Sequence, residues 1–353
     1  MNIKKVFDNR ILYIDDEMRA EYSKGSISLV HKSTEKSNIR IHIYDNWLYK
    51  IASHVPLLER LLRLEPRYME KVDNNTYILS NSGALLKIDV NTAKTSVIFK
   101  YAKGTKNPLS FCSYIRKNEC EIVFGDYGGH DSQGNVGVYV YKNNCVKEIA
   151  SIPGNIIDHI HRVEYDKYRD CYWIFTGDSD EGSAIWRLEV GNHVPAVFVH
   201  GNQQYRACVA HIQKKSIIYA TDTPISGNSI YEVSIDDKSI NKMTNMPGSC
   251  IYGASKNGWF IFATTVEPDS TLPTIRYRLT NKLGSGIKDR YSHLIAGNKE
   301  VGFKEIWKTK KDWLPMWLFQ FGNIRFPVQH TNELYFCPQS CKAKGTYCIN
   351  HNN

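Results

Sequence analysis

A short polar cluster in the middle of the chain has the residue types and the spacing of a reactive site. Asp158, His159 and His161 open a run of alternating apolar residues. In an extended strand, residues two apart point to the same side, so we expect the two imidazoles to converge on one point. Such a pair can hold a metal or act as acid and base, although either histidine could equally be a buried, hydrogen-bonded residue. A metal would need a third ligand from another strand, and the candidates are His130, Asp178 and Asp222.

A second cluster, Tyr205 and Arg206, precedes another apolar strand. The guanidinium fork of an arginine binds both oxygens of a carboxylate, so Arg206 is a candidate for recognising an acidic sugar. The alternative is a salt bridge to Asp178 or Asp222 in a neighbouring strand pair.

A third cluster lies in the segment GDYGGHD, which carries Asp126, Tyr127, His130 and Asp131. Its two glycines allow a sharp backbone turn, which we expect to lift His130 onto the same face as the other clusters. The alternative is a solvated glycine-rich loop.

Carboxylates recur where successive apolar strands end, at Asp126, Asp178, Asp222 and Glu267. Paired carboxylates serve as acid and as base or nucleophile in glycoside hydrolysis. Their regular recurrence also fits side chains that cap turns and tie neighbouring strand pairs together.

The spacing of these carboxylates indicates the fold. They are separated by 52, 44 and 45 residues, and a period near 40–50 with about four short strands per unit is typical of a β-propeller. In a hairpin, the start of one strand and the end of its partner lie at the same edge, so each unit delivers its polar residues to one common face. We predict an all-β propeller of six or seven blades and a single domain over residues 1–353. Its parts are N-terminal strands and a helix (1–69), repeated blades (70–330) and a closing strand with a Cys/His tail (331–353).

One short amphipathic helix is predicted near the N-terminus. Residues 55–66 carry leucines at helical spacing between two prolines. We expect one leucine face to pack against the sheets; a partner-binding helix is the alternative. The alternating runs at 39–51 and 274–280 are predicted strands.

The net charge, the lengths of the apolar runs and the number of cysteines limit the class of protein. The net charge of +9 indicates either a scattered basic surface or an anionic partner. We expect an acidic glycan or its precursor and no nucleic acid, because the basic residues are dispersed. No apolar run is long enough for a signal peptide or a membrane-spanning helix, although peripheral membrane contact stays open. The nine cysteines are odd in number and sit mostly within apolar strands, so we expect reduced thiols and a cytoplasmic protein; the oligomeric state stays open.

The C-terminal segment CPQSCKAKGTYCINH could hold a structural zinc ion through Cys337, Cys341, Cys348 and His351. Its spacings match no standard zinc finger, and a frayed tail is the alternative. Just before it, three tryptophans interleave with lysines. They could stack on sugars or touch a membrane surface, or they could belong to the core of a blade.

The order of motifs NPLSF, GDYGGH, HIH, TGD, QYRA, TDT and TTVEP resembles that of bacterial BNR-repeat, sialidase-like propellers encoded with surface-polysaccharide genes, such as those for capsule or O-antigen. In plan it is also similar to propeller polysaccharide lyases. The resemblance implies a carbohydrate role, with His and Tyr as base and acid and Arg at the uronate. The matching catalytic candidates are His130, His159, His161, Tyr127, Tyr205 and Arg206. The matching substrate-binding candidates are Asp126, Asp178, Asp222, Tyr252 and Glu267.

Two departures from that family disfavour sialidase activity: no blade has an intact Asp-box, and no arginine triad is evident. The first hypothesis is therefore a polysaccharide lyase, with a divalent metal at His159 and His161 as an optional cofactor. The alternatives are a glycoside hydrolase that uses paired carboxylates and a non-catalytic propeller that binds glycan or scaffolds polysaccharide biosynthesis.

Overall fold

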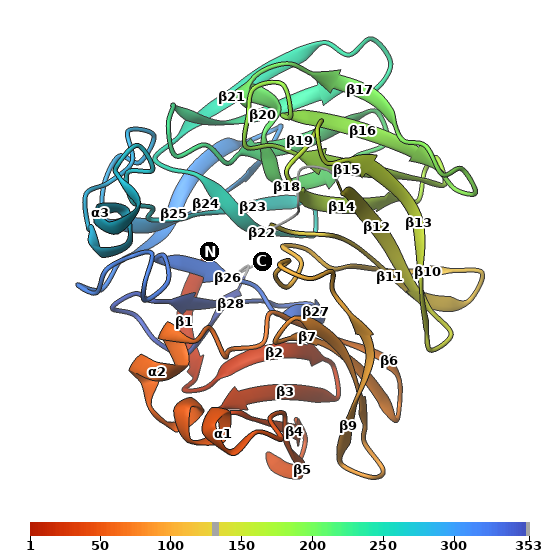
Figure 1. Cartoon of the computed structure of the whole chain (residues 1–353), viewed down its shortest axis with the longest axis vertical. Coiled ribbons are helices and arrows are strands. Elements are labelled where there is room, and N and C mark those ends of the chain that lie inside the picture. Colours follow the sequence, from red (N-terminus) through yellow and green to blue (C-terminus); the bar gives the residue numbers. More distant parts are fainter. Residues whose placement is uncertain (129–133, 351–353) are drawn as a thin grey trace.

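The chain folds into a ring of small antiparallel sheets around a central axis, which is a β-propeller (Figure 1). The computed structural model describes residues 1–128 and 134–350. Its described residues form seven sheets, so the predicted propeller is confirmed and has seven blades.

The strands follow one another around the ring. The blade nearest the N-terminus contains β2 (Arg10–Asp15), β3 (Met18–Ser23), β4 (Ser26–His31) and β5 (Lys36–His42). The next two contain β6 (Tyr68–Asp73), β7 (Thr76–Asn81), β8 (Ala84–Asp89) and β9 (Lys94–Lys100), then β10 (Cys112–Arg116), β11 (Glu119–Gly125), β12 (Asn135–Lys142) and β13 (Cys145–Pro153). Two more contain β14 (Ile160–Asp166), β15 (Cys171–Thr176), β16 (Ala184–Glu189) and β17 (Ala196–His200), then β18 (Ala207–Ile212), β19 (Ser216–Thr221), β20 (Asn228–Ser234) and β21 (Ile240–Met246). The sixth contains β22 (Cys250–Lys256), β23 (Trp259–Thr264), β24 (Tyr291–Asn298) and β25 (Gly302–Lys310).

The last blade closes the ring with both ends of the chain. It joins β1 (Asn2–Phe7) to β26 (Asn323–Arg325), β28 (Leu334–Gln339) and β29 (Thr346–Asn350). β1 pairs antiparallel with β29, and the short β27 (Val328–His330) pairs in parallel with β2 of the neighbouring blade. Two separate pairings therefore hold the N-terminal and C-terminal segments together, and β1 lies in the same blade as the C-terminal strands in Figure 1.

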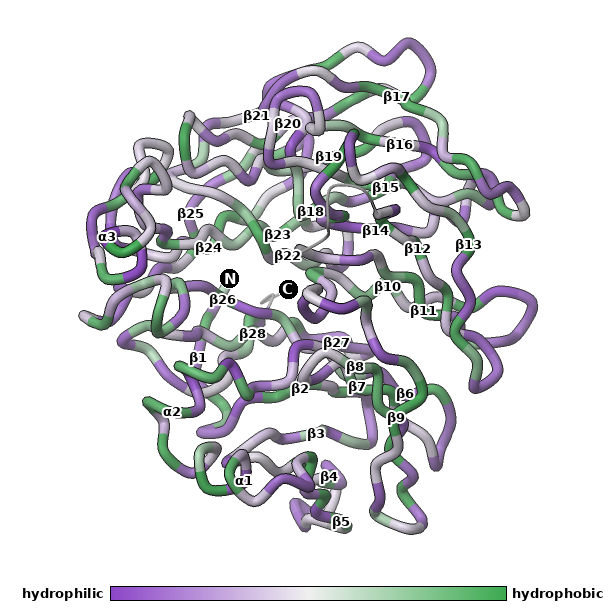
Figure 2. The backbone as a smooth tube through the Cα atoms, in the orientation of Figure 1, coloured by the Kyte–Doolittle hydropathy of each residue, from purple (hydrophilic) through white to green (hydrophobic). Residues whose placement is uncertain are grey.

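Burial follows the position of a strand within its blade. The second strands β7, β15 and β19 are buried along their whole length, whereas the outer strands β9 and β17 are largely exposed. Hydrophobic and hydrophilic stretches alternate accordingly along the chain (Figure 2). The apolar side chains pack between neighbouring blades, and a fully buried one such as Phe175 contributes roughly 1.5–3 kcal/mol. This packing fixes the relative positions of the strand ends, where the polar residues lie.

The helical region near the N-terminus differs from its prediction. Instead of one helix over 55–66 there are two, α1 (Trp47–His54) and α2 (Pro56–Leu61). Part of the predicted strand 39–51 is helical because Asn46 caps α1, its side chain accepting a hydrogen bond from Leu48 N at 2.9 Å. The leucines of α2 are exposed rather than packed on the sheets, so that expectation was also wrong.

A second predicted strand, 274–280, is also helical and forms α3 (Thr274–Leu279). The remaining helical turn is the 3-10 segment η1 (Gln203–Tyr205). No helix within residues 1–128 and 134–350 has the length and apolar character needed to cross a bilayer.

Candidate functional site

The polar clusters meet at one face of the ring, as the repeat predicts. β14 and β18 begin there, while β15 and β19 end there, and each first strand pairs antiparallel with its second. β14 and β18 each carry a β-bulge immediately after their first residue, which places His161 and Cys208 at equivalent bulge positions. Bulges re-aim side chains and are common next to functional sites.

The two histidines converge, as the sequence predicts, and Asp178 joins them. His159 Nε2 lies 3.0 Å and His161 Nε2 lies 3.7 Å from Asp178 Oδ2. The two imidazole rings are 4.9 Å apart. Neither contact has the alignment of a hydrogen bond. Asp178 Oδ2 is therefore buried without a hydrogen-bond donor among the described residues, and the buried His161 Nδ1 has no hydrogen-bond partner there either. Ligand atoms of these three residues all lie within 4.8 Å of one another, which suits a divalent cation.

The backbone around Asp178 is unusual for a non-glycine residue. Asp178 has φ +83°, a conformation that costs free energy and persists where the surrounding structure enforces it. The preceding residue must be glycine, since a Cβ at Gly177 would lie 2.5 Å from His161 Cε1 and 2.6 Å from Arg206 Cγ. The TGD motif thus brings the Asp178 carboxylate against the histidines.

Burial and charge set the protonation of this group. Burial, followed by the neighbouring His161, lowers the pKa of His159 to about 3, so its imidazole is neutral at pH 7. Burial alone would raise the pKa of Asp178, but His161, His159 and Arg206 outweigh it and hold that pKa well below its ordinary value. A neutral imidazole beside a carboxylate can bind a metal or accept a proton.

Arg206 forms a salt bridge with Asp178, which was the alternative to binding an acidic sugar. Its Nη2 lies 2.9 Å from Asp178 Oδ1, and its Nη1 donates to the Asp178 carbonyl at 3.4 Å. The guanidinium is therefore engaged by the protein itself and does not present a free fork to a substrate. Tyr205, at the end of η1, has no contact with the histidines in the described part of the chain.

The next blade adds a second acidic group. The Cys208 thiol donates to Asp222 Oδ2 at 3.1 Å, and ligand atoms of His161, Cys208 and Asp222 form another set within 4.8 Å. Glu267 is buried and accepts a hydrogen bond from Thr265 Oγ1. Burial, followed by Asp222, raises the pKa of Glu267 to about 7, a value at which a carboxyl group can exchange protons near neutral pH.

The GDYGGHD segment is only partly described. Tyr127 meets His159 edge-on, with ring centroids 4.5 Å apart, and so belongs to the site. Asp126 instead accepts from Gly137 N at 2.9 Å and from Tyr139 Oη at 3.0 Å, which ties it into its own blade. The predicted His130 and Asp131 lie outside the described residues.

The C-terminal cysteines are buried at separate positions. Cys337 contacts Thr346 Oγ1 at 3.2 Å, Cys341 contacts Ser292 Oγ at 3.7 Å, and Cys348 donates to Asn350 Oδ1 at 2.9 Å. Within residues 1–128 and 134–350 they do not form a set of three converging ligands. His351 lies beyond the described residues, so the complete predicted zinc set stays a prediction.

Comparisons with known proteins show a similar fold and no related sequence. No protein-family model matches the chain, and no curated protein matches it. Among solved structures, the CNH domain of AfRom2 is similar with a TM-score of 0.57 at 8% identity, over 100% of both chains. An oligogalacturonate lyase in complex with manganese has a TM-score of 0.49 at 10% identity, over 84% of this chain and 74% of its own. Another, from Vibrio parahaemolyticus, has a TM-score of 0.49 at 9% identity, over 98% of this chain and 96% of its own. The likeness to the CNH domain, at 8% identity, shows a shared fold and leaves the chemistry to the site.

Several residues near this face were not predicted as site residues. They are basic or thiol side chains that contact Tyr127, His161 or Tyr252, namely Arg67, Lys106, Cys208 and Arg325. A signal for the arginines was present, because Arg10, Arg67 and Arg206 each stand at or just before the start of an inner strand, as the repeated plan would allow. Cys208 could not be distinguished by sequence from the other thiols in apolar strands.

Proposed function

We propose that the protein acts on an acidic polysaccharide, or on a precursor of one, and cleaves it by β-elimination. The observation that carries this proposal is the position of His159. Its imidazole stands between the Asp178 carboxylate, 3.0 Å from Nε2, and the Tyr127 ring, 4.5 Å between centroids. A proton acceptor, a charge that stabilises its protonated form and a phenol are therefore adjacent at one face of the propeller.

Elimination assigns one task to each of these groups. His159 accepts the proton on the carbon next to the uronate carboxylate. The electron pair of that C–H bond forms a carbon–carbon double bond as the bond to the glycosidic oxygen breaks. Tyr127 donates its phenolic proton to the leaving oxygen. Asp178 stabilises the imidazolium that forms, because an opposite charge at this distance favours the protonated ring.

Further observations support the choice of substrate class. The net charge of +9 favours an anionic partner. The motif order that resembles propellers of surface-polysaccharide gene clusters favours a bacterial capsule or O-antigen glycan. A cytoplasmic location, and hence a precursor as substrate, fits nine cysteines that form no disulfide.

The test is ultraviolet absorbance on incubation with uronate polymers, polygalacturonate and alginate, because elimination creates an absorbing double bond and hydrolysis does not. We expect absorbance to rise with the wild-type protein and to be lost in His159→Ala and in Tyr127→Phe. His193→Ala is the matched control, since His193 is exposed and its Nδ1 lies 2.8 Å from the Ile149 carbonyl, away from the histidine pair. Binding of the polymers without any product would instead assign the protein to the non-catalytic glycan-binding class.

A second candidate function rests on a separate pair of residues. Glu267, with its pKa raised to about 7, and the neighbouring Asp222 could act as acid and base in glycoside hydrolysis. New reducing ends without ultraviolet absorbance, abolished by Glu267→Gln and retained in His159→Ala, would assign the hydrolase function and overturn the lyase.

A further inference from the structure

Five arginines lie at or beside the inner strands that surround the central axis. Arg10 begins β2, Arg67 precedes β6, Arg162 lies in β14, Arg206 precedes β18 and Arg325 ends β26. These strands neighbour one another around the ring: β14, β18, β22 and β26 contact in succession, as do β2 and β6.

Three of the five are neutralised by carboxylates. Arg10 Nη1 lies 3.4 Å from Glu65 Oε2. Arg162 Nε donates to Glu164 Oε1 at 2.6 Å. Arg206 is paired with Asp178, as described above. The partners of these arginines are supplied by the chain itself.

Arg67 and Arg325 differ from the other three. Arg67 Nη1 donates to two backbone carbonyls, those of Asn107 at 2.8 Å and Pro108 at 3.3 Å. Arg325 lies with its Cζ 5.4 Å from the centre of the Tyr252 ring, and its buried Nε, like those of Arg10 and Arg206, has no hydrogen-bond partner among the described residues. Neither guanidinium has a carboxylate partner among residues 1–128 and 134–350.

The two arginines that lack a carboxylate partner both lower the pKa of Tyr252. Burial would raise the pKa of the Tyr252 phenol, but Arg325, Arg67 and Arg10 outweigh it and lower that pKa. Burial, with Arg10 and Arg67 nearby, also lowers the pKa of Arg325 to about 10, so Arg325 stays charged at neutral pH. The interior around Tyr252 therefore carries an excess of positive charge, which an anion would relieve.

We infer that Arg67 and Arg325, together with Tyr252, form the subsite that binds the negatively charged oxygens of an acidic sugar. The inference rests on the proposed function for the identity of the sugar and replaces Arg206 in the role that the sequence suggested. Arg67 also connects this subsite to the reactive group, because its Cζ lies 5.6 Å from the Tyr127 ring and Tyr127 meets His159. A guanidinium fork binds carboxylate and phosphate alike, so both anions are probes.

The experiment measures binding rather than catalysis, by calorimetric titration with trigalacturonate and with inorganic phosphate. We expect Arg325→Gln and Arg67→Gln each to lower the affinity for the more tightly bound anion at least tenfold. Arg325→Lys should lower this affinity less, because it keeps the charge. Arg290→Gln, which removes one charge from an exposed arginine, should bind as the wild type does. Thermal unfolding of each variant checks that it is folded.

Tyr252 provides an independent measurement of anion binding. Anion binding should raise the pKa of its phenol, which is followed as the difference in ultraviolet titration between the wild type and Tyr252→Phe. Unchanged affinities in both glutamine variants would overturn the subsite. A lost affinity in a protein that shows no lyase activity would sustain the subsite and overturn only the proposed reaction. If phosphate binds more tightly than trigalacturonate, the subsite would be assigned to a phosphorylated rather than a carboxylated sugar.

A separate surface carries a second inference. The helices α1, α2 and α3 expose an unusual number of large apolar side chains: Trp47, Leu48, Tyr49, Ile51, Leu57, Leu58, Leu61, Ile275 and Leu279. Trp313 is 80% exposed and follows Asp312, which pairs with Arg60 of α2; its carbonyl accepts a hydrogen bond from Asn281, just after α3. Exposed apolar patches of this extent mark interaction sites.

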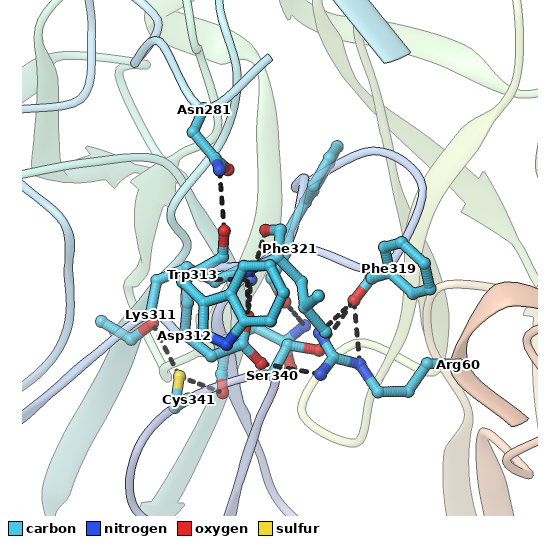
Figure 3. Close-up of polar contacts among 12 residues, drawn as sticks. Arg60, Asn281, Lys311, Asp312, Trp313, Phe319, Phe321, Ser340 and Cys341 are labelled. Atoms are coloured by element: carbon cyan, nitrogen blue, oxygen red, sulfur yellow. Dashed lines mark hydrogen bonds and ion pairs between the residues drawn. The ribbon is translucent and has the colours of Figure 1, made fainter. Parts of the chain in front are cut away.

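Contacts join these elements into one continuous surface. Arg60 of α2 lies 2.7 Å from Asp312 and donates to the Phe319 carbonyl, while Asn281, just after α3, donates to the Trp313 carbonyl at 2.9 Å (Figure 3). Arg63 and Arg278 both lie over the Trp317 ring, at 6.0 and 4.7 Å from its centre. We call α1, α2, α3 and Trp313 the apolar rim.

The charge of the apolar rim identifies its partner. The helices carry the basic residues Lys50, Arg276 and Arg278, besides Arg60, which is paired with Asp312. Their one acidic residue, Glu59, is turned inward to Tyr22. Aromatic and leucine side chains interleaved with basic ones are typical of helices that lie in the interface of an anionic bilayer. We propose that the apolar rim docks the propeller on an anionic membrane surface.

Sedimentation with vesicles tests the docking. We expect the protein to sediment with phosphatidylglycerol–phosphatidylcholine vesicles but not with phosphatidylcholine alone, and Leu57→Glu/Leu61→Glu to remain in solution. Ile115→Glu is the matched control, because Ile115 is 70% exposed on β10, outside the rim. Failure to sediment with either vesicle would overturn the proposal, as would light scattering that shows a dimer abolished by the same rim variant.

Discussion

Arg206 Nη2 lies 2.9 Å from Asp178 Oδ1, so the two most prominent charged residues of the polar face neutralise each other. This pair crosses from one blade to the next, since Asp178 follows β15 and Arg206 precedes β18. It leaves the second carboxylate oxygen of Asp178 facing His159 and His161. The arginine therefore positions the site, and substrate charge must be met elsewhere.

Removal of Arg206 should cost stability as well as activity. Arg206→Ala leaves the Asp178 charge partly buried without its partner, and we expect a loss of about 1–3 kcal/mol in the free energy of unfolding. Urea unfolding measures it. Arg187→Ala, which breaks a more exposed pair with Glu189, should cost less than about 1 kcal/mol. Equal losses in the two variants would show that the Asp178 pair is an ordinary surface contact.

A single methyl group at Gly177 should disable the site. Gly177→Ala places a Cβ 2.5 Å from His161 Cε1, so the imidazole must move away from Asp178. We expect loss of lyase activity and about 1–3 kcal/mol of destabilisation. Gly227→Ala is the control, because its Cβ meets nothing within 4 Å. Full activity in Gly177→Ala would mean that the position of His161 does not matter to the reaction.

Metal content distinguishes the two overlapping ligand sets, which share His161. If the purified protein holds a divalent cation at this face, His161→Ala should abolish it. His159→Ala should abolish only a cation bound with Asp178, and Cys208→Ser only one bound with Asp222. Elemental analysis of the four proteins makes the assignment, with Cys337→Ser/Cys341→Ser as the test of the C-terminal zinc. Metal retained in His161→Ala but lost in the cysteine variant would place it in the tail and leave His159 free to accept a proton.

The repeated pattern was enough to predict the propeller and the convergence of His159 and His161, because strand periodicity determines which ends share a face. Asp178 was one of three candidates for the third member of the group, and the pattern could not choose among them. It could not predict the bulge that re-aims His161, since a bulge changes the register without a sequence mark of its own. Nor could it assign charge pairing. For Arg206 it left open both an acidic sugar and a salt bridge to Asp178 or Asp222, and the structure shows the pair with Asp178. Arg325, which the pattern did not select, has no acidic partner in the described chain.

The helices were mispredicted for a local reason. The run IRIHIYDNWLYKI alternates like a strand, but Asp-Asn in its middle is a helix N-cap signal, and Asn46 caps α1. Residues 274–280 alternate as well, yet most of this short segment forms the exposed helix α3. In both places exposed apolar residues imitate the pattern of a buried strand, and only the tertiary structure distinguishes them.

Stability should fall with rising pH because of Glu59. Burial raises the pKa of Glu59 to about 7 in the folded protein, against an ordinary 4.5, and its carboxyl accepts a hydrogen bond from Tyr22 Oη at 2.6 Å. The folded state thus holds this proton more tightly than the unfolded state. The resulting stabilisation is complete below pH 4.5 and is lost as the pH rises through about 7. Allowing for the partial exposure of Glu59, we expect the free energy of unfolding of Glu59→Gln to exceed that of the wild type by about 2 kcal/mol at pH 8 and to match it near pH 4 in urea unfolding. A pH-independent difference between the two proteins would show that the Glu59 carboxylate is already ionised throughout this range.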